Sequence, residues 1–116
     1  MEESLGRVTI APSVLVTIVQ KTALSVPGVA DLHEAVPSVR RLLGFHTVGR
    51  GVVVRVEQDQ VAVDVYVIAR RGVDLLQMGR QAQHDITRAI QDIVGKAVRE
   101  VNVHVEDVAV EPAAEG

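Results

Sequence analysis

Four histidines are the residues of this chain best suited to acid–base chemistry or metal binding: His33, His46, His84 and His104. No two of them stand three or four residues apart, and none has a carboxylate at the spacing of a helical zinc site. His84 falls on the polar side of a predicted helix, and His104 falls on the polar face of a predicted strand. We therefore expect surface histidines, no metal site and no cofactor.

Residues 44–51 contain three glycines, as phosphate-binding loops do, but the order of elements differs. A P-loop places Lys and then Ser or Thr directly after its last glycine, where a helix begins. Here Gly51 leads into three consecutive valines, which is a strand pattern. The segment is expected to be a flexible link between elements.

The remaining nucleophiles and acids form no catalytic pattern either. The four serines stand near predicted helix starts or turns, where hydroxyl groups usually bond the backbone, and none lies in a Gly-x-Ser-x-Gly elbow. Adjacent acids such as Glu106 and Asp107 point to opposite faces of a strand. The chain has no cysteine, which excludes thiol nucleophiles, disulfides and cysteine zinc sites. The sequence predicts a protein that is not an enzyme.

The length and composition of the chain are typical of one small domain without a transmembrane helix. The chain has 116 residues, of which 47% are hydrophobic and 2% aromatic, and its net charge is −3. Acidity and scarce aromatics argue against a general binder of nucleic acid. No apolar run reaches the roughly 18 residues of a transmembrane helix, and the acidic start does not resemble a secretory signal. We expect a cytoplasmic protein that reaches the membrane only peripherally, through a partner.

The spacing of apolar residues changes several times along the chain, and each change predicts an element. The first elements are a short β-prone run at residues 7–10 and a helix from Pro12 to about Leu24, which ends at a Ser-Val-Pro-Gly sequence. A weak strand or loop at residues 29–33 follows. One or two helical turns are expected at residues 36–43.

The strongest pattern is a β-hairpin followed by a helix and a strand. Valines alternate with other residues over 52–57 and again over 61–68, with a short polar break between. Asp74 can cap the next helix, and Gly95 can end it. Between them runs an apolar stripe of Leu75, Gly79, Ala82, Ile86, Ala89, Ile90 and Ile93. A last strand, with valines on one face, covers residues 100–106.

These elements predict an α+β fold. The small mixed sheet combines the hairpin with a β-α-β crossover, which is right-handed by default if its strands are parallel. Two main helices cover the valine-lined face of the sheet. We expect a single domain over residues 6–110, a flexible N-terminus at residues 1–5 and a flexible acidic tail at residues 111–116.

The other face of the sheet is one candidate interaction surface. Its predicted members are Arg55, Asp64, Tyr66, Asn102 and His104. Such a face is either open to water or buried against something else, and in the second case self-association or a protein partner would cover it. Tyr66 has an apolar ring and one polar tip, and it is the natural anchor of such a contact.

Arginines in the middle of the chain are a second candidate surface. This basic cluster consists of Arg40, Arg41, Arg50, Arg70 and Arg71. If these side chains converge, they suit an acidic protein, an RNA backbone or anionic lipid headgroups. If they do not, they form an ordinary solvated surface, because neighbouring strand residues point to alternate sides.

Four segments in this order resemble the alkaline shock protein family, the Gls-type bacterial proteins linked to envelope stress. They are residues 8–12 (VTIAP), 26–30 (VPGVA), 61–67 (VAVDVYV) and 98–108 (VREVNVHVEDV). The chain departs from the family at three informative places. Leu76 and Gln77 stand where relatives commonly have Pro and an acid at the start of the long helix. Ala11 stands where Ser or Thr usually caps the first helix, and Gly79 stands where Ala is usual within the long helix.

The resemblance implies a small, non-catalytic cytoplasmic protein of cell-envelope homeostasis, and relatives are sometimes held at the membrane by an anchored partner. The family has no accepted catalytic residues to transfer. The leading hypothesis is an interaction or scaffold module in the envelope stress response, which acts by self-association or through a protein partner near the membrane. The alternative is a small RNA-binding domain that uses an arginine-rich surface.

Overall fold

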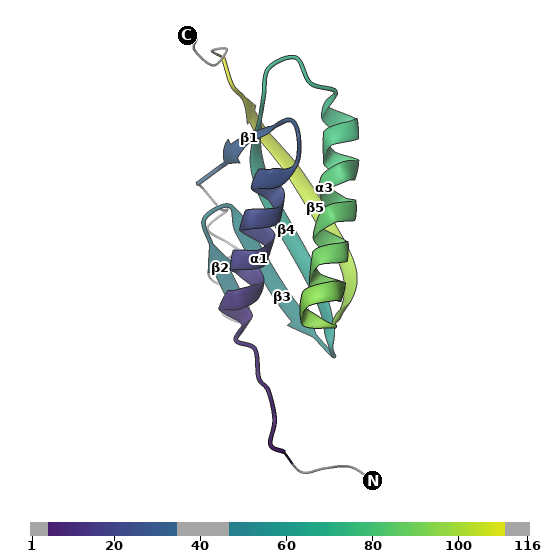
Figure 1. Ribbon diagram of the computed structural model, residues 1–116. Coiled ribbons are helices and arrows are strands. Elements are labelled where there is room, and N and C mark those ends of the chain that lie inside the picture. The colour runs from purple at the N-terminus through teal and green to yellow at the C-terminus, as the bar shows by residue number, and fades with distance from the viewer. Residues whose placement is uncertain (1–4, 35–46, 111–116) are drawn as a thin grey trace.

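The computed structural model of this chain describes residues 5–34 and 47–110. In these ranges the chain forms two helices and five strands: α1 (Pro12–Ser25), β1 (Val29–Leu32), β2 (Thr47–Gly49), β3 (Val52–Glu57), β4 (Gln60–Ala69), α3 (Leu75–Ala89) and β5 (Ala97–Val108). A π-helical turn, Ile90–Val94, continues α3. The two helices lie side by side on one face of a single sheet (Figure 1). The predicted α+β class is confirmed.

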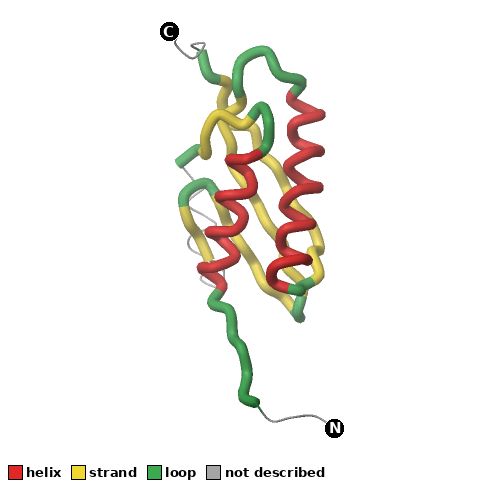
Figure 2. Tube along the Cα trace, in the orientation of Figure 1, coloured by secondary structure: helices red, strands yellow, loops and turns green. Residues whose placement is uncertain are grey.

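β4 is the centre of the sheet (Figure 2). β5 runs parallel to it along one edge, from Gln60 paired with Ala97 to Ala69 paired with Val108. The opposite edge is shared by two antiparallel strands, β3 against the first half of β4 and β1 against its end. β2 pairs with β3 and closes that side. The sheet is mixed, as expected, and the β4–α3–β5 unit is the predicted crossover.

The β3–β4 hairpin has a two-residue loop. Glu57 pairs with Gln60, so only Gln58 and Asp59 lie between the strands, and both have positive φ angles of 50° and 70°. This is the turn geometry whose twist matches that of the flanking strands. The predicted hairpin is confirmed, and its turn sets the register that places Val54 opposite Val63.

Three of the predicted helix ends are confirmed. Asp74 accepts a hydrogen bond from the backbone nitrogen of Gln77 at 3.1 Å, which caps α3. Gly95, with φ of 76°, ends the helical segment in the left-handed conformation that glycine tolerates best. Pro12 is the first residue of α1, and Ala11 before it makes no side-chain cap.

The core lies between the helices and the valine face. Buried valines of β3 and β4 pack against buried residues of α1 and α3. The buried stripe of α3 and its π turn consists of Met78, Ala82, Ile86 and Ile90. The predicted stripe is therefore wrong at both ends, because Leu75 is 41% exposed and Ile93 is 65% exposed. Both stand at ends of the helical segment, where less of the sheet lies beneath them.

Two local predictions are also wrong. Residues 7–10 form no strand, and they extend away from the body as an exposed arm (Figures 1 and 2). Residues 47–49 of the expected flexible link form strand β2. The helical turns expected at residues 36–43, most of the expected N-terminal tail and the tail at 111–116 lie outside the described residues.

Candidate interaction surfaces

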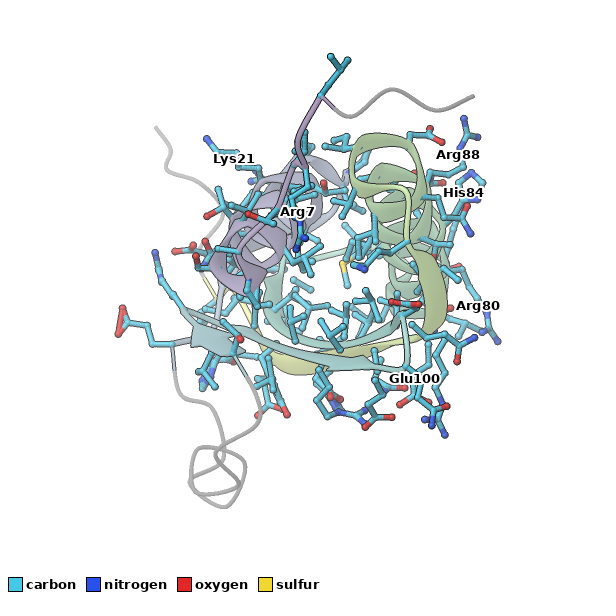
Figure 3. The ribbon with its side chains drawn as sticks, turned by 90° about the horizontal axis from the view of Figure 1, so that it is seen from below. Arg7, Lys21, Arg80, His84, Arg88 and Glu100 are labelled. Atoms are coloured by element: carbon cyan, nitrogen blue, oxygen red, sulfur yellow. The ribbon has the colours of Figure 1, made fainter. Side chains whose placement is uncertain are left out.

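The structure brings the five residues of the predicted polar face to the side of the sheet that faces away from the helices. Glu100, on the same side, marks this face in Figure 3. The five residues fall into two groups: the buried Asp64 and Tyr66 form a cluster with the partly exposed His104, whereas Arg55 and Asn102 belong to a network of charged side chains. The face is not a uniform exposed surface.

The cluster of Asp64, Tyr66 and His104 spans β4 and β5, and the side chain of His104 is 35% exposed. Nε2 of His104 lies 2.9 Å from Oδ1 of Asp64. The rings of His104 and Tyr66 stack with centroids 4.5 Å apart and planes 13° apart. Asp64 is only 1% exposed and Tyr66 only 3%. The expectation that Tyr66 is the exposed anchor of this face is corrected, because its ring is buried within the chain itself.

An Asp–His pair can serve catalysis when a nucleophile lies beside the histidine. The serines that the structure describes are Ser13 and Ser25, and both belong to α1, on the opposite side of the sheet. The Ser25 hydroxyl donates to the carbonyl oxygen of Lys21 at 2.9 Å. Neither of these two serines therefore lies beside the pair, and the contact gives the buried Asp64 carboxylate the hydrogen-bond partner that it needs.

Arg55 is the centre of the second group. Its side chain is 18% exposed, and its guanidinium lies 3.0 Å from Glu100 and 3.4 Å from Glu57. Glu57 also pairs with Arg99 at 2.8 Å, and Asn102 donates to Glu100 at 3.2 Å. Positive charge on this face is therefore matched by neighbouring carboxylates.

The arginines of the basic cluster are not shown to converge. Arg40 and Arg41 lie outside the described residues. Arg50 pairs with Asp31 at 3.2 Å and with Glu34 at 3.6 Å, and Nη1 of Arg71 donates to the carbonyl oxygen of Val110 at 3.0 Å. The carboxylates of Asp31 and Glu34 offset the positive charge of Arg50, which lowers the attraction of this position for phosphates.

Neither a metal centre nor a membrane span is visible in the described parts of the chain. Within residues 5–34 and 47–110, no three His, Asp or Glu side chains come together as metal ligands. None of the helices in those ranges combines the length and the apolar composition that crossing a bilayer requires. His84 projects from the outer flank of α3 with Arg80 and Arg88 (Figure 3).

An apolar hollow between α3 and β5 was not predicted. It measures about 350 Å³ and is lined by Leu75, Leu76, Gly79, Arg80, Gln83, Val103 and Val105. Leu76 is 68% exposed and Val105 is 36% exposed. A Cβ atom built on Gly79 would meet no heavy atom within 4 Å, so this glycine leaves the hollow open. We call these seven residues the α3–β5 hollow.

Two signals in the sequence could have pointed to this hollow. Leu75 and Leu76 are adjacent, and a helix with one buried stripe cannot turn both of them inward. The last strand also has only one neighbour in the predicted topology, so its outer edge is free. We expected Leu75 in the core because the spacing of apolar residues continues through it.

Similarity to known proteins extends over almost the whole chain. It is 28% identical over 112 residues to YqhY, an uncharacterised protein of Bacillus subtilis (strain 168), covering 96% of this chain and 83% of that one. It is 25% identical over 108 residues to YloU, another uncharacterised protein of the same strain, covering 90% of each. No solved structure matches the chain significantly.

The family match is more informative than these relatives. The sequence pattern of the family of alkaline shock protein 23, described as having a cell envelope-related function, matches residues 1–110. The match includes every helix and strand described above. The resemblance inferred from the four sequence segments is confirmed, and the chain belongs to this family of proteins with a cell envelope-related function.

Proposed function

We propose that this protein is a non-catalytic interaction module that serves the cell envelope by binding copies of itself or a protein partner near the membrane. The observation that carries this proposal is the α3–β5 hollow. Leucines and valines line it beside a free strand edge, and apolar side chains gathered in this way mark surfaces that another protein covers. The family's cell envelope-related function supports the place of action.

The hollow is a better contact surface than the predicted polar face. Asp64 and Tyr66 are already buried within the chain, so a partner gains little by covering them. Leu76, in contrast, is 68% exposed. Burial of a leucine side chain contributes about 1.5–3 kcal/mol to association, before the entropic and desolvation costs of binding are subtracted. The contact surface is therefore expected at the first turn of α3 and the second half of β5.

Replacement of Leu76 by glutamate tests this function. The exposed side chain makes Leu76→Glu compatible with folding, whereas a charge in the hollow opposes burial by a partner. Sedimentation velocity over a range of concentrations measures self-association of the full chain. Co-fractionation with the envelope of the native cells measures attachment near the membrane. We expect Leu76→Glu to weaken at least one of the two by about tenfold or more.

Gln77→Glu is the matched control. Gln77 is exposed, lies on the same helical turn and does not line the hollow, so the variant adds the same charge beside it. It should behave as the unmodified protein in both measurements. If Leu76→Glu also leaves both unchanged, the hollow is not the contact surface and the proposal is wrong.

A further inference from the structure

The N-terminal arm, residues 5–11, has the properties of a strand that lacks a partner strand. Its backbone is extended after Gly6, and the segment leaves the body at the start of α1 (Figure 1). Val8 is 91% exposed and Leu5 is 88% exposed. Val8 and Ile10 fall on one side of an extended chain, and Arg7 and Thr9 fall on the other. An apolar side and a polar side are what a strand needs at the edge of a half-buried sheet.

The outer edge of β5 has the complementary properties. Nε2 of Gln83 donates to the carbonyl oxygen of Val101 at 3.1 Å, so the peptide groups of Val101 point away from β4. Because peptide groups alternate along a strand, those of Val103 and Val105 point outward too. Within the described residues β5 pairs only with β4. The N–H and C=O groups of these two valines are therefore open to an added strand, directly beside the hollow.

Side chains and charge match on both sides of such a pairing. Val103 and Val105 face the helices, so an added strand that continues the sheet would turn Val8 and Ile10 toward the hollow. Arg7 would then face the other side, near Glu106 and Asp107 at the end of β5. No described side chain forms an ion pair with these three residues. Opposite charges placed in this way favour one register over the others.

The arm and the hollow of one molecule lie at opposite ends of α1. The arm joins the first residue of α1, whereas Pro27 and Gly28, just after α1, line a second pocket together with Val73 and Asp74, just before α3. A helix of 14 residues is about 21 Å long. The arm extends from the start of α1, away from the loop that follows the other end of that helix (Figure 1). The geometry therefore favours an arm that reaches a neighbouring molecule.

We propose that residues 7–10 of one copy add to the outer edge of β5 of a second copy, with Val8 and Ile10 seated in its α3–β5 hollow. This inference rests on the proposed function and names the partner as this chain itself. The donor and acceptor surfaces differ, so each added copy leaves one arm and one edge free. Such head-to-tail contacts build rings or open chains rather than two-fold dimers.

Two variants and their mixture test the inference. Val8→Asp places a charge on the arm, and Leu76→Glu places one in the hollow. Both positions are highly exposed, and circular dichroism verifies that both variants fold. In sedimentation velocity, each variant alone should associate at least about tenfold more weakly than the unmodified chain. An equimolar mixture should form dimers and nothing larger, because one copy keeps an intact arm and the other an intact hollow.

The conservative variant Val8→Ile is the control and should assemble as the unmodified chain does. If Val8→Asp assembles normally while Leu76→Glu does not, the arm is not the occupant, and only this inference is overturned. The inference is also overturned if the mixture stays monomeric. It is overturned as well if Val8→Asp self-associates normally and loses only its binding to a different protein. If both variants assemble normally and stay with the envelope, the proposed function fails as well.

Exchange of charges tests the register. Arg7→Glu should weaken assembly about threefold or more, and addition of Glu106→Arg to the same chain should restore it, because the pair is re-formed with its signs reversed. The restored assembly should be sensitive to salt in the same way as that of the unmodified chain. Absence of rescue would place Arg7 away from the end of β5 and overturn the proposed register.

Discussion

Asp64 and His104 join the two parallel strands of the sheet through one part-buried contact, with Oδ1 and Nε2 2.9 Å apart. The same register that pairs Tyr66 with His104 places their rings in a stack. Asp64 is the one charged residue among the buried residues of the described chain. A carboxylate in that position destabilises a fold unless donors surround it, so His104 secures β5 against β4.

Replacement of His104 by alanine should therefore lower the free energy of unfolding. Asp64 would lose a hydrogen bond that involves a charged group, and Tyr66 would lose its stacked ring. The expected loss is about 1.5–3 kcal/mol. Urea denaturation, followed by circular dichroism, measures it.

His84→Ala is the control for that measurement. His84 lies on the outer flank of α3 (Figure 3), and its replacement should change the free energy of unfolding by no more than about 0.5 kcal/mol. Equal urea midpoints for His104→Ala and the unmodified chain would show that the Asp64–His104 contact does not stabilise the fold.

Tyr66→Asp should act on folding rather than on partner binding. The ring is buried, so the variant removes a large side chain and buries a second carboxylate beside Asp64. We expect a loss of about 3 kcal/mol or more in the free energy of unfolding. Tyr66→Phe keeps the stacked ring and should lose less than half as much. A Tyr66→Asp variant as stable as the unmodified chain would instead support an exposed anchor on this face.

Two glycines should respond in opposite directions to replacement by alanine. Gly79 is within α3, and a Cβ there has open space, so Gly79→Ala should raise the free energy of unfolding by about 0.5–1 kcal/mol. Gly51 has φ of 68°, and a Cβ there would lie 2.9 Å from Cβ of Leu32. Gly51→Ala should lower stability by about 1–3 kcal/mol. Urea midpoints measured side by side would contradict this account if the two changes had the same sign.

Local patterns predicted most of the fold because they reflect local physics. Alternating valines identified β3, β4 and β5, since successive side chains of a strand point to opposite faces. Pro12, Asp74 and Gly95 marked helix ends because each suits the backbone geometry of a terminus. These signals need no knowledge of distant residues.

The features that were missed depend on distant residues. Alternation placed Asp64 and Tyr66 on one face correctly, but it cannot show that this face is covered at its centre. Residues 7–10 have the composition of a strand, but a strand also needs a neighbour, and no described segment pairs with the arm. Residues 47–49 form β2 because β3 lies beside them as the neighbouring strand. The exposure of Leu75 likewise depends on where the helix lies over the sheet.

The parallel pairing of β4 with β5 also has a consequence for synthesis of the chain. Among the described elements β5 stands last along the chain, so α1, α3 and the β3–β4 hairpin leave the ribosome before His104 is available to Asp64. A nascent chain that ends before Ala97 has one bare edge along all of β4, and its Asp64 lacks the hydrogen-bond contact with His104. Emergence of β5, rather than formation of the β3–β4 hairpin, is therefore the step that completes this sheet and the contact between Asp64 and His104.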